Sequence, residues 1–206
     1  MLDPYFACLI FAGMALGTLG LQVTLRLAIL WTTLLALWLI YHEGRVFSGS
    51  YRYRDVGLGV GIGLAIGLPT LLLAFHGLAQ AIPILYAGPA PSAQVELTGS
   101  TVFASLVVLA PLAEELFFRD MLHKERGFWI GTGLYAAAGV LLFLPTAGQF
   151  PVVLFAVSGA AAVLGVLYAF LYERYGLATA LSCHATANLM LLCLPATLSH
   201  LDLFSR

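Results

Sequence analysis

Long apolar runs separated by short polar connections make up most of this sequence. A helix needs about 20 mostly apolar residues to cross the hydrocarbon core of a bilayer, and only the first two runs fall clearly short of that length. The pattern therefore predicts an all-α fold, a polytopic transmembrane helical bundle of about seven spans in a single integral membrane domain, residues 1–206. The expected spans are residues 5–20, 27–41, 56–78, 101–122, 128–145, 151–171 and 176–195.

The composition agrees with a membrane environment. Of the 206 residues, 61% are hydrophobic and 9% are charged, and the mean hydropathy is +0.97. A soluble protein of this size carries far more charge on its surface, so the lipid bilayer is an expected partner. The sequence has no basic stripe, which argues against binding to nucleic acid. No Lys or Arg precedes the first apolar run, so we expect a retained span there rather than a signal peptide.

The basic residues predict how the bundle is oriented. They gather in three connections that alternate along the chain, residues 42–55, 123–127 and 172–175, whereas residues 79–100 contain no Lys or Arg. By the positive-inside rule, these three connections and the N-terminus are cytoplasmic. Arg26 and Arg206 do not follow this pattern. Residues 79–97 contain three prolines and are expected to form an outer loop, with or without a short interfacial helix.

Glycines recur at every fourth position in the third span. Gly59, Gly63 and Gly67 form one row, and Gly57 and Gly61 form another. Small residues at this spacing let two helices approach closely in lipid. The rows therefore predict tight helix packing, and a hinge at Pro69 is the alternative.

Three charged residues lie in the fourth span, within the stretch LAPLAEELFFRD. An ionised residue at the centre of a spanning helix costs roughly 2.5–3.5 kcal/mol, so Glu114, Glu115 and Arg119 need compensation. Glu115 and Arg119 are four residues apart with the acid first, which is the favourable order for a helical ion pair. Glu114 has no basic partner on its own helix. Such a carboxylate suits a general base, although a purely structural ion-pair cluster remains the alternative.

A second polar pair lies in the last span. His184 and Asn188 are four residues apart and therefore share one helix face. Glu114 and His184 are each eight residues from the same end of their spans, or about 12 Å deep. The spacing predicts one polar chamber around Glu114, His184 and Asn188, open to the cytoplasm. The alternative is that His184 is a buried core residue whose hydrogen bonds are satisfied and which has no catalytic role.

Peptide-bond hydrolysis is the chemistry that such a chamber suits. Glu114 would hold and deprotonate a water molecule. His184 and Asn188 would donate hydrogen bonds to the oxyanion that forms on the scissile carbonyl. Arg119 would hold Glu115 and fix the helix.

Two motifs resemble a known family. EELFFR at 114–119 resembles the EExxxR motif, and HATAN at 184–188 the HxxxN motif, of the CAAX-protease and bacteriocin-processing (CPBP) family, also called the ABI family. The resemblance implies a glutamic-type intramembrane endopeptidase that cleaves membrane-anchored peptides or proteins, with Glu114 as the catalytic base and His184 and Asn188 stabilising the oxyanion or orienting water. It divides the chain into N-terminal spans with an outer loop, a protease-like core and a tail, at residues 1–99, 100–195 and 196–206.

One family motif is incomplete. The family's FxxxH motif is matched by Phe143, but Ala147 stands at the histidine position, and residues 124–183 contain no histidine. The polar residues that remain as substitutes are His76, His123, Tyr135, Thr146 and Gln149. The missing histidine supports a second hypothesis, a non-catalytic membrane scaffold or partner-binding protein of the same fold. A small transporter is a third hypothesis, because buried Glu and Arg also mark ion paths, although the lack of inverted repeats weighs against it. The compact chain and its lack of targeting signals lead us to expect a prokaryotic inner membrane.

No cofactor is expected. Two carboxylates and one histidine are compatible with zinc, but there is no HExxH motif and the second histidine is absent, so a zinc site is not predicted. Cys8, Cys183 and Cys193 fall in apolar runs and are expected to be packing residues. Cys183 and His184 are neighbours on a helix and point about 100° apart, so they do not form a dyad.

Overall fold

Helices are the only regular elements in the part of the chain that the computed structural model describes, residues 3–43, 52–86, 100–147 and 151–200. Four helices are long and apolar enough to cross a membrane. The continuous helices are α1 (Pro4–Gly17), α2 (Val23–Tyr41), α3 (Tyr53–Leu85), α7 (Phe128–Leu142), the short α8 (Leu144–Ala147) and α9 (Pro151–Tyr175). The all-α bundle predicted from the sequence is confirmed.

Two further rods contain wide π-helical turns. The first runs through α4 (Ser100–Ala104), η2 (Ser105–Leu109), α5 (Ala110–Glu115), η3 (Leu116–His123) and α6 (Lys124–Arg126). The second runs through α10 (Leu177–Asn188), η4 (Leu189–Cys193) and α11 (Leu194–His200). With these two rods the seven predicted spans are all present as helical segments.

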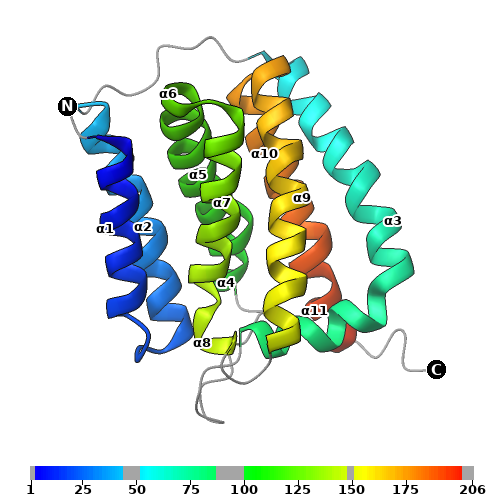
Figure 1. Ribbon diagram of the computed structural model, residues 1–206. Coiled ribbons are helices and arrows are strands. Elements are labelled where there is room, and N and C mark those ends of the chain that lie inside the picture. The colour runs from blue at the N-terminus through cyan, green and yellow to red at the C-terminus, as the bar shows by residue number, and fades with distance from the viewer. Residues whose placement is uncertain (1–2, 44–51, 87–99, 148–150, 201–206) are drawn as a thin grey trace.

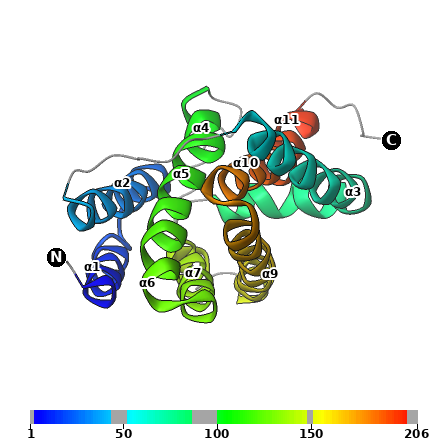
Figure 2. The ribbon, with the colours of Figure 1, turned by 90° about the horizontal axis from the view of Figure 1, so that it is seen from above.

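The helices run alternately up and down, and the N- and C-terminal ends lie at opposite ends of the bundle (Figure 1). The turns before α7 and α10 lie at the end near the N-terminus. They use Gly127 and Gly176, whose φ angles of 86° and 89° strain any residue with a side chain. Seen from above, α5 and α10 lie between α1 and α2 on one side and α3 on the other (Figure 2). The orientation of the bundle in a membrane stays a prediction.

Helix α3 is longer than the sequence predicts. It continues through Pro83 to Leu85, so the predicted loop at 79–97 is wrong for residues 79–85. The helix bends, and its last turns cross the lower end of the bundle (Figure 1). Ile82 and Leu85 are buried there, and their burial keeps the segment helical although Pro83 removes a backbone donor. Residues 87–97 lie outside the described part of the chain.

The first glycine row packs as predicted. A Cβ atom at Gly63 would lie 2.7 Å from Thr186 Cβ, and one at Gly59 would lie 2.0 Å from Ser182 Oγ. Gly57 and Gly61 have open space beside them, so the second row makes no close contact. The row that contains Gly63 therefore sets the distance between α3 and α10.

We expect Gly63→Val to destabilise the protein by about 1–3 kcal/mol, because the added atoms overlap Thr186 and the Cys183 carbonyl. Gly61→Val is the matched control, since it makes the same change on the open face of the same helix. Unfolding in detergent measures both variants. Equal free energies of unfolding for the two variants would show that the close contact between Gly63 and α10 does not stabilise the protein.

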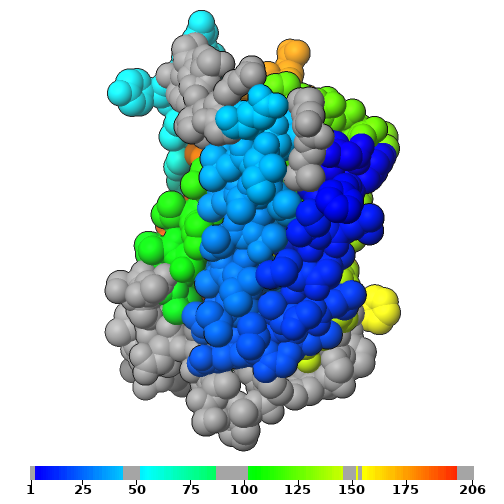
Figure 3. Space-filling model, turned by 90° about the vertical axis from the view of Figure 1, so that its left-hand side faces the viewer, coloured from blue at the N-terminus to red at the C-terminus, as the bar shows by residue number. Residues whose placement is uncertain are grey.

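Arg26 does not follow the charge pattern because it is not in a connection. It is 1% exposed and donates hydrogen bonds to the carbonyl oxygens of Ala15 (2.9 Å), Leu141 (2.7 Å) and Leu142. These carbonyls lie at the C-terminal ends of α1 and α7, where the helix dipole favours a cation. The guanidinium thus ties α1, α2 and α7 together. Figure 3 shows α1 and α2 packed against each other across one face of the molecule.

Candidate active site

The three charged residues of the fourth span are buried together. Glu115 Oε2 lies 3.5 Å from Arg119 Nε, and neither side chain is exposed. Arg119 Nη2 also donates a hydrogen bond to the Gly165 carbonyl oxygen of α9, at 3.1 Å. The guanidinium lies 4.7 Å above the ring of Tyr135 on α7. The predicted Glu115–Arg119 pair is therefore present, and it joins three helices.

His184 lies between the two glutamates. Its Nδ1 is 2.9 Å from Glu115 Oε1, and its Nε2 is 3.8 Å from Glu114 Oε2. Tyr168 stacks on the imidazole with ring centroids 4.5 Å apart and planes inclined by 16°. The depth prediction is thus correct for these residues. The imidazole is held in one orientation, and each of its nitrogens faces a carboxylate.

Glu114 has no basic partner on its own helix, as the sequence indicates, but it has a hydrogen-bonding partner on another helix. The indole Nε1 of Trp31 on α2 donates a hydrogen bond to Glu114 Oε1 at 3.1 Å. Oε2 is the oxygen nearer His184. The residues that compensate Glu114 come from α2 and α10, so they are invisible to an inspection of its own helix.

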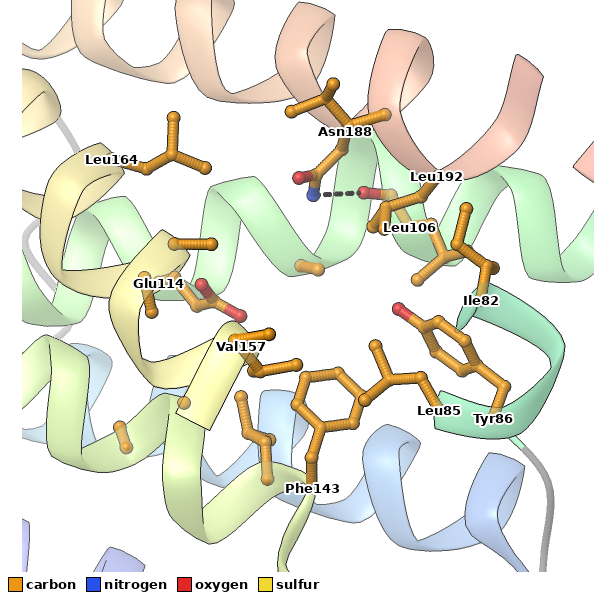
Figure 4. Close-up of a pocket in the computed structure, with 18 of the residues that line it drawn as sticks. Ile82, Leu85, Tyr86, Leu106, Glu114, Phe143, Val157, Leu164, Asn188 and Leu192 are labelled. Atoms are coloured by element: carbon orange, nitrogen blue, oxygen red, sulfur yellow. Dashed lines mark hydrogen bonds between the residues drawn. The ribbon is translucent and has the colours of Figure 1, made fainter. Parts of the chain in front are cut away.

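Asn188 lines the same cavity as Glu114 and His184. Its Nδ2 donates a hydrogen bond to the Leu106 carbonyl oxygen at 2.9 Å (Figure 4). Leu106 lies in the π-helical turn η2, where wide turns leave backbone groups available and are frequent at functional sites. One N–H of the amide is thus engaged, and the second remains for another acceptor.

The cavity has a volume of about 460 Å³ and is lined mainly by apolar side chains. Glu114 lies at one side of it, and Phe143, Leu85 and Tyr86 border it further along (Figure 4). It therefore extends from the charged cluster towards the end of the bundle that carries α8.

The predicted opening towards the basic connections is wrong. Phe117, Met121 and Leu122 are fully buried on that side of the cluster and close it. On the other side, Ala156 and Ala160 of α9 line the cavity and are exposed. The cavity opens beside α9, facing the last turns of α3.

Tyr135 is a site residue that the sequence did not single out from other polar residues. It lines the cavity and meets the imidazole of His184 edge-on at 6.2 Å between ring centroids. An aromatic residue in an apolar run carries no signal that separates this position from ordinary packing.

Two other substitutes for the missing histidine, His123 and His76, do not reach the cluster. His123 Nε2 lies 3.2 Å from Glu173 Oε1. Burial lowers the pKa of His123, while Glu173 acts in the opposite direction. His76 is on an exposed face of α3. Ala147 lies in α8, and Gln149 and the side chain of Thr146 lie outside the described part of the chain.

The cysteines are unbonded, with Cys183 and Cys193 buried and Cys8 half-buried. Among the residues that the structure describes, no group of three His, Cys, Asp or Glu side chains is arranged to hold a metal ion.

Comparison with known proteins identifies part of the chain. Residues 94–190 match the family model described as type II CAAX prenyl endopeptidase, Rce1-like. The matched segment includes the charged cluster, His184 and Asn188, and it leaves out α1, α2 and α3. No curated protein and no solved structure matches the chain.

Proposed function

We propose that this integral membrane protein is a glutamic-type intramembrane endopeptidase of the CPBP family, because residues 94–190 match the family model of Rce1-like type II CAAX prenyl endopeptidases. The observation that carries the proposal is His184, held with one nitrogen at Glu115 and the other facing Glu114, beside a cavity large enough for part of a substrate.

The reaction begins with a water molecule at Glu114. The Glu114 carboxylate takes a proton from this water as its oxygen bonds to the scissile carbonyl carbon. The carbonyl oxygen becomes an oxyanion and accepts hydrogen bonds from His184 Nε2–H and the free N–H of Asn188. When the C–N bond breaks, Glu114 returns the proton to the leaving nitrogen. No cofactor takes part.

Glu115 and Arg119 support this chemistry without contacting the reacting atoms. Glu115 accepts the Nδ1–H of His184, which directs Nε2 towards Glu114. Arg119 balances the charge of Glu115. The Glu115–Arg119 ion pair stabilises the helix that carries Glu114. Glu114 itself remains available to exchange a proton with water.

The cavity suits a membrane-anchored peptide or protein. Its walls are mainly apolar, and the exposed Ala156 and Ala160 mark an opening on a side of the bundle that faces lipid. A lipid-anchored or membrane-spanning segment can reach the cluster through this opening without leaving the bilayer.

We place the N-terminus in the cytoplasm because of the basic connections, and we propose a prokaryotic inner membrane as the location of the protein. With that orientation, the lining of the cavity extends away from the cytoplasmic end of the bundle, towards Leu85 and Phe143.

We expect Ala160→Trp to lower kcat/KM for a farnesylated peptide about tenfold or more, because the indole fills the opening of an apolar cavity. Val163→Trp is the control, since Val163 is 71% exposed on the same helix and does not line the cavity. Peptide cleavage in liposomes measures both. Equal rates for the two variants would rule out access past α9, and no cleavage by folded wild-type protein would reject the proposed function.

The second candidate is a scaffold or partner-binding protein of the same fold. The observation that favours it is Ala147 at the position of the motif histidine. A scaffold keeps partner binding when Glu114 is changed to glutamine, whereas a protease loses cleavage.

A further inference from the structure

Trp31 is the one tryptophan that reaches the charged cluster among the described residues. It is 4% exposed, lines the cavity, and donates its indole N–H to Glu114 Oε1 at 3.1 Å. Helix α2, which carries it, lies outside the segment that matches the family. The N-terminal part of the chain thus touches the proposed base directly.

This hydrogen bond acts on the orientation of the carboxylate. A hydrogen bond from an N–H to a carboxylate oxygen is directional, and here it engages Oε1. Oε2 is left towards His184. A carboxylate held at one oxygen presents the other in a constant direction, as a base must to take a proton from a positioned water.

Helix α2 is anchored on both sides of Trp31. Five residues before it, Arg26 binds the carbonyl oxygens of Ala15, Leu141 and Leu142. Seven residues after it, Trp38 Nε1 donates a hydrogen bond to Asp120 Oδ2 at 2.9 Å. The indole of Trp31 is therefore held in place along the helix axis by contacts independent of Glu114.

We propose that Trp31 is a positioning residue of this enzyme: its indole N–H holds Oε1 of Glu114 so that Oε2 faces the reacting water beside His184. The proposal rests on the proposed function. It makes α1 and α2 part of the catalytic machinery rather than a membrane anchor alone.

Trp31→Phe tests this role, because phenylalanine keeps an aromatic ring in the cavity wall and removes the N–H. We expect kcat for a farnesylated peptide to fall about 10- to 100-fold with KM within about twofold of wild type, as for a misplaced catalytic group. Trp129→Phe is the control. It makes the same change at a tryptophan that is 77% exposed and does not line the cavity, and it leaves kcat unchanged.

In the Glu114→Gln background, Trp31→Phe should cause no further loss, because both changes act through one carboxylate. Equal kcat values for Trp31→Phe and Trp129→Phe would overturn the proposal, as would a loss confined to KM.

A measurement without substrate separates this inference from the proposed function. The chain has three tryptophans, so ¹⁵N-labelled protein gives three indole N–H resonances, which the Trp→Phe variants assign. We expect Glu114→Gln to move the Trp31 resonance and leave that of Trp129, which is 77% exposed, in place. An unmoved Trp31 resonance would overturn the proposal even if the protein is a protease. A moved resonance in a protein that cleaves nothing would reject the proposed function and leave the contact as a structural one.

Discussion

Glu114→Gln is expected to lower kcat for a farnesylated peptide by about 10²–10⁴-fold, the contribution of a general base. Glutamine keeps the size of the side chain, and its carbonyl oxygen can still accept the hydrogen bond of Trp31. It cannot accept a proton from water. The loss should therefore appear in kcat while the protein stays folded.

Glu125→Gln is the matched control for this change. Glu125 is exposed on α6 and accepts a hydrogen bond from Tyr41 at 2.5 Å, away from the cavity. Cleavage by the control should stay within about twofold of wild type, since surface substitutions are usually mild. If Glu114→Gln retains more than a tenth of the wild-type kcat, Glu114 is not the base.

Arg119→Met is expected to destabilise the protein by about 3–5 kcal/mol, the cost of leaving a buried charge without its partner. Glu115 has no exposed surface and would keep only the imidazole of His184 beside it. The Gly165 carbonyl oxygen would lose its donor as well. Equilibrium unfolding in detergent, followed by circular dichroism, measures the change.

The double variant Glu115→Gln, Arg119→Met separates lost charge compensation from lost packing. Removing both charges leaves no unpaired ion, so the double variant should be more stable than Arg119→Met alone. If the double variant is less stable, the packing of Arg119 over Tyr135 is its main contribution.

The close approach of Glu114 and His184 was predictable because an α-helix has a constant rise per residue. A fixed rise per residue places two side chains at the same depth once the span boundaries are known. Helix geometry also predicted the Glu115–Arg119 pair and the glycine row that contains Gly63. These features depend on spacing within one helix or on depth in the bilayer.

The partners contributed by other helices were not predictable in the same way. Trp31 and Tyr135 are aromatic residues in apolar runs, and the sequence does not show which face of α2 or α7 turns towards Glu114. His184 was assigned to the oxyanion, yet it also hydrogen-bonds Glu115. Such contacts depend on how the helices are arranged around α5.

The direction of the cavity was mispredicted for a related reason. Depth gives the level of the cluster but not which side of it is filled, and Phe117 and Met121 fill the side of the basic connections. Pro83 was taken as the sign of a loop, yet the helix tolerates it because the flanking apolar residues are buried. Arg26 is an exception to the charge pattern of the connections, and the sequence does not show that it binds buried carbonyls.

The most direct test of the central claim is cleavage of a farnesylated CAAX peptide by the purified wild-type protein in liposomes with a chelator present, with the products identified by mass spectrometry. We predict a single new peptide C-terminus, formed at the same rate with and without the chelator. An intact peptide after prolonged incubation with folded protein, or cleavage that the chelator abolishes, would contradict a metal-independent protease that uses Glu114 as its base.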